Sequence, residues 1–348
     1  MEVRLIEFFI REWHNQEYLQ ELGEKKLYVA FEKHCKLLTN SGVVDVDELG
    51  CMHEEADTRL ILHANHASSA GFENVVIVAD DTDVLMIALS HVKEMNANVF
   101  QKRGNRNRTR LVNVSQINLS MGTVADALLG VYAFTGCDSV SAFAGKGKLP
   151  AVKLMKKNER YLKLFKRLGQ ELIVSDDDVC LIQEFVCDLY GGEKLGVKTV
   201  SELRYLLFCA KGAALSSHQL PPSIGCLKKH ILRANYQAYI WRNSLEKMLM
   251  LPSPDGFGWK IIDGDLEIDW TDDKPAPDSV IEMLACKCKK PCAESACDCH
   301  QNRLPCTDVC SCKCENKYEN EDEENEESDD ETDDEYDDYD DEDVDDSD

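Results

Sequence analysis

The chain has 348 residues and a formal net charge of −26, because 65 acidic side chains stand against 39 basic ones. Its N-terminus shows no basic segment followed by an apolar run and a cleavage site, and no stretch approaches the roughly 18 uncharged apolar residues of a membrane span. We therefore expect an intracellular protein that does not enter a membrane and is long enough for two domains with additional segments.

The first predicted elements lie in residues 1–53, which we expect to form an incomplete N-terminal part of the core. Residues 26–44 alternate between apolar and polar side chains as in a β-hairpin, and Asn40, Ser41 and Gly42 supply a turn.

A helix and a buried strand follow in the predicted domain 54–216. The pattern of residues 54–70 predicts a helix that ends at Gly71, with one apolar face made of Ala56, Leu60, Ile61 and Ala64. The apolar run Val75–Val78 is typical of a strand buried on both faces of a parallel sheet. Helix, buried strand and a further crossover together predict an α/β fold.

Carboxylates recur around this strand. Asp80, Asp81 and Asp83 follow its C-terminal end, where open α/β sheets place ligand sites. Glu55 and Asp57 begin the preceding helix, and Asp138 follows a predicted helix over residues 124–134. Oxygen ligands gathered from several elements suit magnesium or manganese. The alternative interpretation is an exposed acidic turn that binds nothing.

A basic loop is predicted between two strands, residues 97–100 and 111–114. Such a loop can anchor phosphates, although a solvated hairpin tip fits the same residues. Its five basic side chains are Lys102, Arg103, Arg106, Arg108 and Arg110.

The order of these motifs resembles the flap-endonuclease and wider PIN-like nuclease family over residues 26–212. The family's E-A-E-A motif corresponds to Glu55-Ala56-Asp57-Thr58, its D-x-D to Asp81-Thr82-Asp83, and its G-x-D to Gly136-Cys137-Asp138. The resemblance implies a PIN-like parallel sheet with a helical extension and one or two magnesium or manganese ions. It also implies that the catalytic carboxylates are Glu55, Asp57, Asp81, Asp83 and Asp138.

The same family has a G-x-G-x-x-x-A turn whose backbone N–H groups hold DNA phosphates. Residues 145–151 fit that turn, which implies DNA contacts by Gly145, Lys146, Gly147 and Lys148. One departure concerns the opening strand of the family, which bears an Asp, whereas no Asp precedes Asp45 here. We therefore expect the first strand and part of one metal site to be missing.

Residues 159–215 have helical periodicity, and we interpret Cys180, Cys187 and Cys209 there as small buried side chains. The predicted segment 217–280 consists of a helix over residues 227–251 and an irregular connector. Trp259 and Trp270 are expected to anchor this connector.

Nine of the sixteen cysteines lie within residues 286–314. An intracellular chain rarely forms structural disulfides, and nine is an odd number, so metal binding is favoured. Structural zinc takes four ligands, so three zinc ions are satisfied by nine thiolates if three of the thiolates bridge. Two separate four-cysteine sites would leave one thiol over. The predicted ligands are Cys286, Cys288, Cys292, Cys297, Cys299, Cys306, Cys310, Cys312 and Cys314.

The cysteine spacing is similar to the tesmin-type CXC module, which implies a three-zinc unit over residues 281–318 that contacts DNA. Lys289, Lys290 and Arg303 are its candidate basic contacts. Ala296 stands where that module often carries a Tyr used for DNA contact. A purely structural zinc knot is the alternative.

Residues 319–348 form an acidic tail with 22 carboxylates and no Lys or Arg, so the rest of the chain holds 43 acidic and 39 basic side chains. We expect this tail to be disordered. It either keeps the chain soluble or acts as a polyanion that competes with nucleic acid or attracts basic chromatin proteins.

Two functional hypotheses remain from the sequence. The first is a nucleic-acid-binding protein of the nucleus, with a degenerate nuclease-like domain and a zinc module that contacts DNA or chromatin. The second is an active structure-specific nuclease that hydrolyses phosphodiesters with magnesium or manganese. The combination of modules also resembles proteins encoded by mobile elements.

Overall fold

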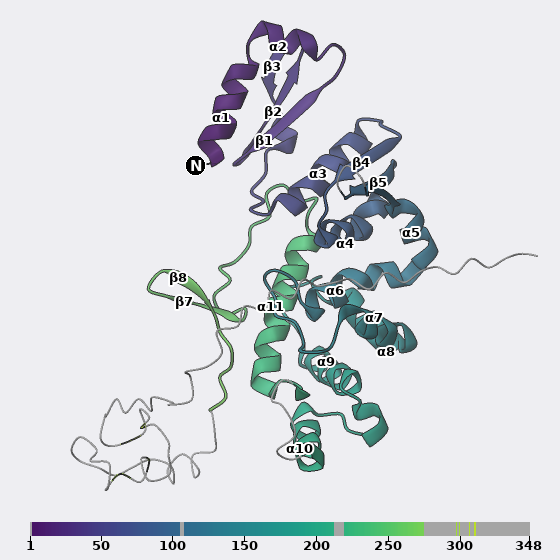
Figure 1. The fold of residues 1–348 in the computed structure, drawn as a ribbon, viewed down its shortest axis with the longest axis vertical. Coiled ribbons are helices and arrows are strands. Elements are labelled where there is room, and N and C mark those ends of the chain that lie inside the picture. The colour runs from purple at the N-terminus through teal and green to yellow at the C-terminus, as the bar shows by residue number, and fades with distance from the viewer. Residues whose placement is uncertain are drawn as a thin grey trace, which may run out of the picture. The chain divides into compact units, whose positions relative to one another are not determined.

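The computed structural model describes residues 2–104, 108–211 and 219–274, together with Cys297, Cys299, Cys306 and Cys310. The chain divides into two compact units, Met1–Asp273 and Lys274–Asp348. The first unit is mixed α/β structure, with small sheets and a larger helical part (Figure 1). This confirms the predicted α/β class. The predicted acidic tail lies outside the described residues, as does all of the predicted zinc module except the four cysteines.

The N-terminal residues form two helices and a small antiparallel sheet. The elements are α1 (Glu2–Trp13), α2 (Gln16–Glu21), β1 (Leu27–Phe31), β2 (His34–Thr39) and β3 (Gly42–Asp45). The predicted hairpin is therefore a three-stranded meander, and the turn before Gly42 joins β2 to β3 instead of closing the first pair. Its own small core contains Cys35, Val46, Leu49 and Cys51, and Leu62 packs into it.

A second sheet carries the parallel pair that the sequence predicts. Its order is β4 (Asn74–Val78), β5 (Asn98–Arg103) and β6 (Arg110–Asn113), with β4 parallel to β5 and β6 antiparallel to β5. The predicted burial of β4 on both faces is wrong. Ile77 is buried, but Val76 and Val78 are 49% and 69% exposed, because helices cover one face of the sheet only. Among the described residues, no strand from the N-terminal sheet joins this one.

Three helices accompany this sheet: α3 (Ala56–Ser69), α4 (Thr82–His91) and α5 (Val114–Met121). The predicted end of α3 is confirmed, since Gly71 has a φ of +90°. Its predicted apolar face is only half right. Ile61 and Ala64 are buried, whereas Ala56 and Leu60 are exposed. Thr58 and Leu62 are buried instead, because Leu62 packs on the N-terminal cluster while Ile61 faces the main core.

The remaining helices build the main core. They are α6 (Ala125–Thr135), α7 (Lys148–Lys157), α8 (Glu159–Arg167), α9 (Asp176–Leu189), α10 (Val200–Lys211) and α11 (Ile224–Arg242). Phe134 lies at the centre, 5.6 Å from the ring of Phe165 and 6.1 Å from that of Phe185. Cys187 is buried as predicted, but Cys180 and Cys209 are exposed, because they lie on the outer sides of α9 and α10.

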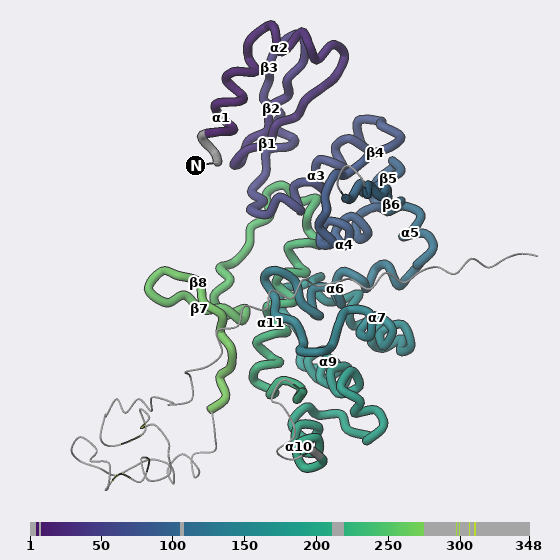
Figure 2. Tube along the Cα trace, in the orientation of Figure 1, coloured from purple at the N-terminus to yellow at the C-terminus, as the bar shows by residue number. Residues whose placement is uncertain are grey.

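The helix α11 shares this core, and Figure 2 shows it running beside α6. The sequence predicts this helix in a separate segment and over residues 227–251, whereas α11 begins at Ile224 and ends at Arg242. Its buried apolar contributions to this core are Leu227, Ile231, Ala234, Ala238 and Trp241. A long helix packed against α6 can therefore contribute side chains to a site in the first unit.

The predicted irregular connector contains a hairpin, β7 (Trp259–Ile262) and β8 (Asp265–Ile268). Trp259 is buried as expected, but Trp270 is 58% exposed. The buried Arg233 of α11 donates to the carbonyl oxygens of Gly258 and Asp269 at 2.9 and 3.1 Å. These bonds hold both ends of the hairpin against α11.

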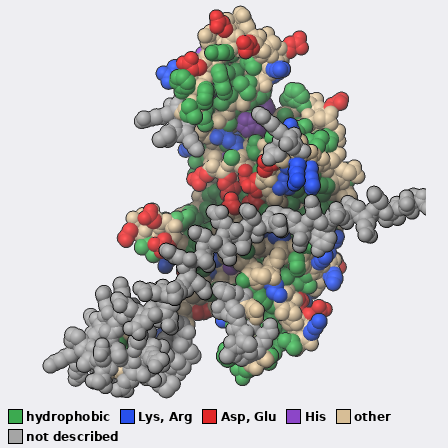
Figure 3. Space-filling model, in the orientation of Figure 1, with side chains coloured by type: hydrophobic (Ala, Val, Ile, Leu, Met, Phe, Trp, Pro, Cys, Tyr) green, Lys and Arg blue, Asp and Glu red, His purple; other side chains and the backbone are tan. Residues whose placement is uncertain are grey.

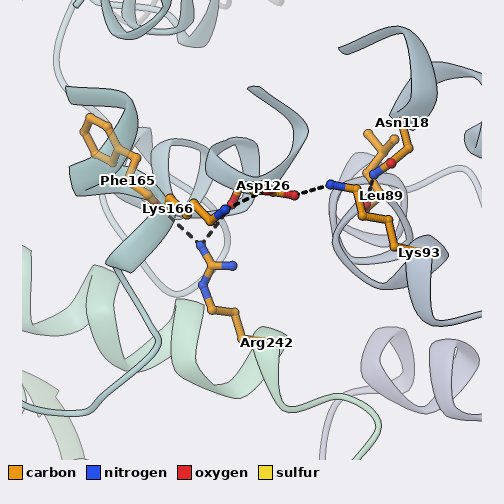
Figure 4. A network of polar contacts seen from close by, with 7 residues as sticks. All are labelled: Leu89, Lys93, Asn118, Asp126, Phe165, Lys166 and Arg242. Atoms are coloured by element: carbon orange, nitrogen blue, oxygen red, sulfur yellow. Dashed lines mark hydrogen bonds and ion pairs between the residues drawn. The ribbon is translucent and has the colours of Figure 1, made fainter. Parts of the chain in front are cut away.

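The described residues contain one stretch, Val114–Thr135, that is long and apolar enough to cross a membrane by length and composition alone. Half of this stretch is buried inside the protein, where α6 forms the centre of the core. Asp126 of α6 accepts ion-pair hydrogen bonds from Lys93 at 2.5 Å and Lys166 at 2.9 Å. Arg242 donates to the carbonyl oxygens of Asp126 and Phe165 (Figure 4). These polar contacts tie α6 to its neighbouring helices.

Candidate metal and nucleic-acid site

One cavity of about 400 Å³ is lined by all five predicted catalytic carboxylates, and we call it the acidic cavity. These carboxylates come from three segments that are far apart in the chain. The cavity is completed by Ala56, Cys137, Ser139, Gln237 and Trp241. Its five carboxylates are Glu55, Asp57, Asp81, Asp83 and Asp138.

Two helix N-termini position four of these carboxylates. Glu55 is the N-cap residue of α3 and Asp57 lies in its first turn. Asp81 is the N-cap of α4 and accepts a hydrogen bond from the backbone N–H of Asp83 at 2.8 Å. Helix N-termini carry partial positive charge, which favours carboxylates there. Asp80 does not line the cavity, because its carboxylate accepts a bond from the backbone N–H of Gly104.

The third segment is the sharp turn that carries Asp138. Gly136 has a φ of +116°, and a Cβ atom on it would lie 2.9 Å from the Cα of Ala142. Cys137 and Val140 then exchange backbone hydrogen bonds of 2.9 and 3.1 Å. Only glycine fits such a position, so the G-x-D motif has a local physical reason.

Side chains that the sequence analysis did not single out orient the carboxylates. Gln237 Nε2 and Trp241 Nε1 donate to the two oxygens of Glu55 at 2.9 and 3.0 Å. The hydroxyl of Tyr132 donates to Asp83 at 2.5 Å. Trp241 and Tyr132 have no signal in the local sequence, because their function depends on the packing of α11 and α6 beside the two acidic turns.

The electrostatics of the cavity favour a bound cation. Partial burial, together with the neighbouring carboxylates of Asp81, Glu55, Asp83 and Asp138, raises the pKa of Asp57 to about 6. Burial also raises the pKa of Asp83, against the hydrogen bond from Tyr132. Carboxylates that repel each other in this way are relieved by a cation between them.

The predicted basic loop lies next to the acidic turn, and Figure 3 shows basic side chains beside a group of acidic ones. Arg103 is engaged in the fold, since it donates to the carbonyl oxygen of Asp80 at 2.7 Å and to the hydroxyl of Thr82 at 3.2 Å. Lys102, Arg108 and Arg110 are exposed. Arg106 lies outside the described residues.

The predicted phosphate-binding turn precedes a helix as expected, because Gly147 is the N-cap of α7. Gly145 has a φ of +65°. Lys148 points back toward the acidic cavity, where its ammonium lies 4.2 Å from the ring centre of Tyr132 and donates to the carbonyl oxygen of Gly136. Lys146 lies over the ring of Tyr190 at 4.8 Å.

In the second unit, the described cysteines lie together. The sulfur atoms of Cys297, Cys299 and Cys306 all lie within 4.8 Å of one another. The sulfur of Cys297 is 3.7 Å from that of Cys306, and the sulfur of Cys299 is 3.6 Å from that of Cys310. Two sulfurs bound to one tetrahedral zinc at 2.3 Å are about 3.8 Å apart, so these spacings suit zinc. The described residues of the acidic cavity form no equally tight group of ligand atoms.

The other predicted residues of the zinc module lie outside the described part of the chain. These are Cys286, Cys288, Cys292, Cys312 and Cys314, together with Lys289, Lys290 and Arg303.

Comparisons of the chain with protein-family models, with curated protein sequences and with solved structures give no significant match.

Proposed function

We propose that this chain is a nucleic-acid-binding protein with a PIN-like, flap-endonuclease-like domain that binds a divalent cation in the acidic cavity. The observation that carries the proposal is the convergence of five carboxylates, from residues 55–57, 81–83 and 138, in one cavity. These are the positions at which the sequence matches three motifs of that nuclease family. Chance acidic turns would have no reason to share one cavity.

The donor set fits magnesium or manganese, which prefer carboxylate oxygens. The hydrogen bonds that Glu55 accepts from Gln237 and Trp241 leave further lone pairs on its oxygens. Such an ion, when bound, neutralises phosphate charge and acidifies a bound water. The chain's own contribution is orientation, because Trp241 and Tyr132 hold two of the carboxylates in place.

Nucleic acid is the substrate class that this site and its surroundings support. Carboxylates without a cation repel phosphate, so the bound ion and nearby basic groups must supply the attraction. Lys102, Arg108 and Arg110 are exposed on the adjoining strands β5 and β6 and their loop. Backbone N–H groups at the start of α7 are a further phosphate site. DNA is favoured over RNA by the resemblance of the zinc module.

Phosphodiester hydrolysis is the second candidate function, because the five carboxylates of the acidic cavity stand at the positions that match the catalytic motifs of the nuclease family. Because the described residues 2–53 contribute no carboxylate to the cavity, we place binding before hydrolysis.

The zinc module and the tail complete the proposal. Three structural zinc ions in residues 281–318 would form a small unit that contacts DNA or chromatin in the nucleus. The tail of residues 319–348 would then compete with DNA or attract basic chromatin proteins. A chain that ends at residue 318 should bind DNA more tightly at low salt, and unchanged affinity would exclude competition by the tail.

The test of the metal site uses the acidic turn itself. Asp81→Ala combined with Asp83→Ala should abolish manganese binding in isothermal titration and weaken binding of branched DNA in manganese. Asp81→Asn with Asp83→Asn keeps the local hydrogen-bond acceptors and controls for misfolding. Asp80→Asn is the matched control, because Asp80 belongs to the same turn but does not line the cavity. The proposal would be contradicted if the wild-type protein bound no manganese. Hydrolysis would be established if the wild type cleaved branched DNA and the double variant did not.

A further inference from the structure

A second cavity of about 550 Å³ adjoins the acidic cavity, and we call it the apolar cavity. Glu55, Ser139 and Gln237 line both cavities, so the two share a wall. Gln237 fixes this wall, because it donates to Glu55 at 2.9 Å and accepts from the hydroxyl of Ser139 at 2.6 Å. The two cavities therefore meet at the same three side chains.

The apolar cavity has an aromatic lining. The rings of Tyr236 and Trp259 lie 5.7 Å apart at 70° to each other, and both side chains are buried. The Tyr236 hydroxyl donates to the carbonyl oxygen of Pro252 at 2.8 Å, which fixes the ring. Apolar side chains make up most of the remaining lining, but the carboxylates of Glu54 and Glu55 and the amide of Asn243 also line the cavity. The Nδ2 of Asn243 donates to the carbonyl oxygen of Tyr239 at 2.8 Å.

The mouth of the cavity is unusually apolar for an exposed surface. Met250 is 79% exposed and Leu266 is 53% exposed, and both line the cavity. Met52 and Leu251, which are 37% and 38% exposed, also line it. Large exposed side chains of this kind, gathered beside a site for charged ligands, mark a binding surface.

We propose that the apolar cavity receives one unpaired nucleobase of the strand whose phosphate lies at the acidic cavity. This inference rests on the proposed function, because it assumes that the acidic cavity binds a cation and a phosphate. A nucleotide combines a charged phosphate with a flat apolar base, and the two adjoining cavities have the same combination of chemistry. A base inside a duplex cannot reach such a cavity, so the preferred substrate is unpaired or splayed at this nucleotide.

The volume and the lining agree with this occupant. Binding cavities for small organic groups measure roughly 300–1,000 Å³ and combine apolar walls with a few polar groups. Aromatic and apolar side chains bind bases of any sequence by stacking, while an amide such as that of Asn243 can bond to a base edge.

The test uses the full chain with calcium in place of manganese and a branched DNA that has one unpaired strand. Met250→Glu should weaken binding of this DNA about tenfold, because it places a charge where the base enters. Met250 is largely exposed, so the fold should tolerate the change. Met248→Glu is the matched control, because Met248 is 58% exposed in the same connector and does not line the apolar cavity.

An abasic nucleotide identifies the base as the occupant. The abasic nucleotide is placed at each position of the unpaired strand in turn. At one position it should lower the affinity of the wild-type protein for the DNA about tenfold. At that position it should not change the affinity of the Met250→Glu variant. If Met250→Glu lowers the affinity equally for intact and abasic strands, the cavity binds something other than a base and the inference is wrong. The inference would also be wrong if the Met250→Glu variant bound the intact branched DNA as tightly as the wild type does.

Manganese titration separates this inference from the proposed function. Met250→Glu should bind manganese as the wild type does, because the acidic cavity is unchanged. If the wild type binds manganese but Met250→Glu does not change the affinity for DNA, only the base site is contradicted and the proposed function stands. Absence of manganese binding in the wild type would overturn the proposed function and the base site with it.

Discussion

Trp241 donates its indole N–H to Glu55 at 3.0 Å, across 186 residues of sequence. The donor lies in the last turns of α11, and the acceptor is the N-cap residue of α3. Gln237, one helical turn earlier, donates to the other oxygen of the same carboxylate. The acidic cavity is therefore held together by the packing of α11 in the core.

Trp241→Phe should weaken manganese binding several-fold without unfolding the protein. The phenyl ring retains most of the buried volume, but Glu55 loses one of its two donors. Such a bond contributes about 1–2 kcal/mol when the acceptor is charged. Titration calorimetry measures the affinity, and thermal unfolding measures the stability. Trp270→Phe, at an exposed tryptophan outside the cavity, should change neither.

The pKa of Asp57 predicts how the stability of the metal-free protein changes with pH. Its pKa is raised from 3.8 to about 6 in the folded state, so its stabilising contribution is complete below pH 4 and is lost as pH rises through 6. Asp57→Asn should therefore raise the melting temperature relative to wild type increasingly from pH 4 to pH 7. Saturating manganese should remove this gain. A difference in melting temperature that is constant across this range would show that Asp57 does not titrate there.

His230 should give the opposite pH dependence. Burial lowers its pKa from 6.5 to about 4, although its bond to the carbonyl oxygen of Phe134 acts the other way. The stability from the neutral imidazole is present above pH 6.5 and is lost as pH falls toward 4, because the unfolded chain binds the proton first.

His230→Gln tests this dependence, because it keeps a hydrogen-bond donor near Phe134. The variant should be less stable than wild type at pH 7, and the gap should narrow as the pH falls to 4.5. Denaturant unfolding at each pH measures the free energy of unfolding of the wild type and of the variant. A gap that widens in acid would contradict a neutral buried imidazole.

The acidic residues of the site could be predicted from sequence because each lies in a short local motif. Glu55 and Asp57 begin a helix, and Asp81 caps another, so their positions follow from local rules. The partners of these residues could not be predicted in that way. Trp241 and Tyr132 lie on helices with ordinary core patterns, and only the packing of those helices brings them to the cavity.

The same limit explains the errors in the fold. A run such as Val75–Val78 predicts a strand but does not say how many neighbours cover it, and Val78 is in fact 69% exposed. The hairpin of the connector did have a local signal, because Asp263-Gly264 is a typical hairpin turn pair and residues 265–268 alternate between polar and apolar side chains. The Pro, Gly and Asp content of the connector outweighed that signal in the prediction. That hairpin is held by Arg233, a residue 25 positions away from one of its two carbonyl acceptors.

Gly136→Ala should disrupt the turn that carries Asp138. The φ of +116° disfavours any other residue, and the new methyl group would lie 2.9 Å from Ala142. We expect a loss of about 2–4 kcal/mol in the free energy of unfolding and weaker manganese binding. Gly145→Ala is the control, because it has a positive φ of +65° but no atom within 4 Å of the new Cβ. It should cost only about 1 kcal/mol. Equal losses in the two variants would show that the close approach to Ala142 has no importance.

Cys297→Ser should lower the zinc content of the purified full-length chain. The sulfur of Cys297 lies with those of Cys299 and Cys306 in a group that suits a tetrahedral ion. A serine hydroxyl is a poor replacement for a thiolate, and in a shared cluster the loss of one ligand weakens neighbouring ions too. Elemental analysis should therefore find three zinc ions per wild-type chain and a loss of more than one in the variant. Cys180→Ser, at an exposed cysteine of α9, should leave the zinc content unchanged. Two zinc ions in the wild type, with the loss of only one in Cys297→Ser, would indicate separate four-cysteine sites, because ions that share no thiolate are lost independently.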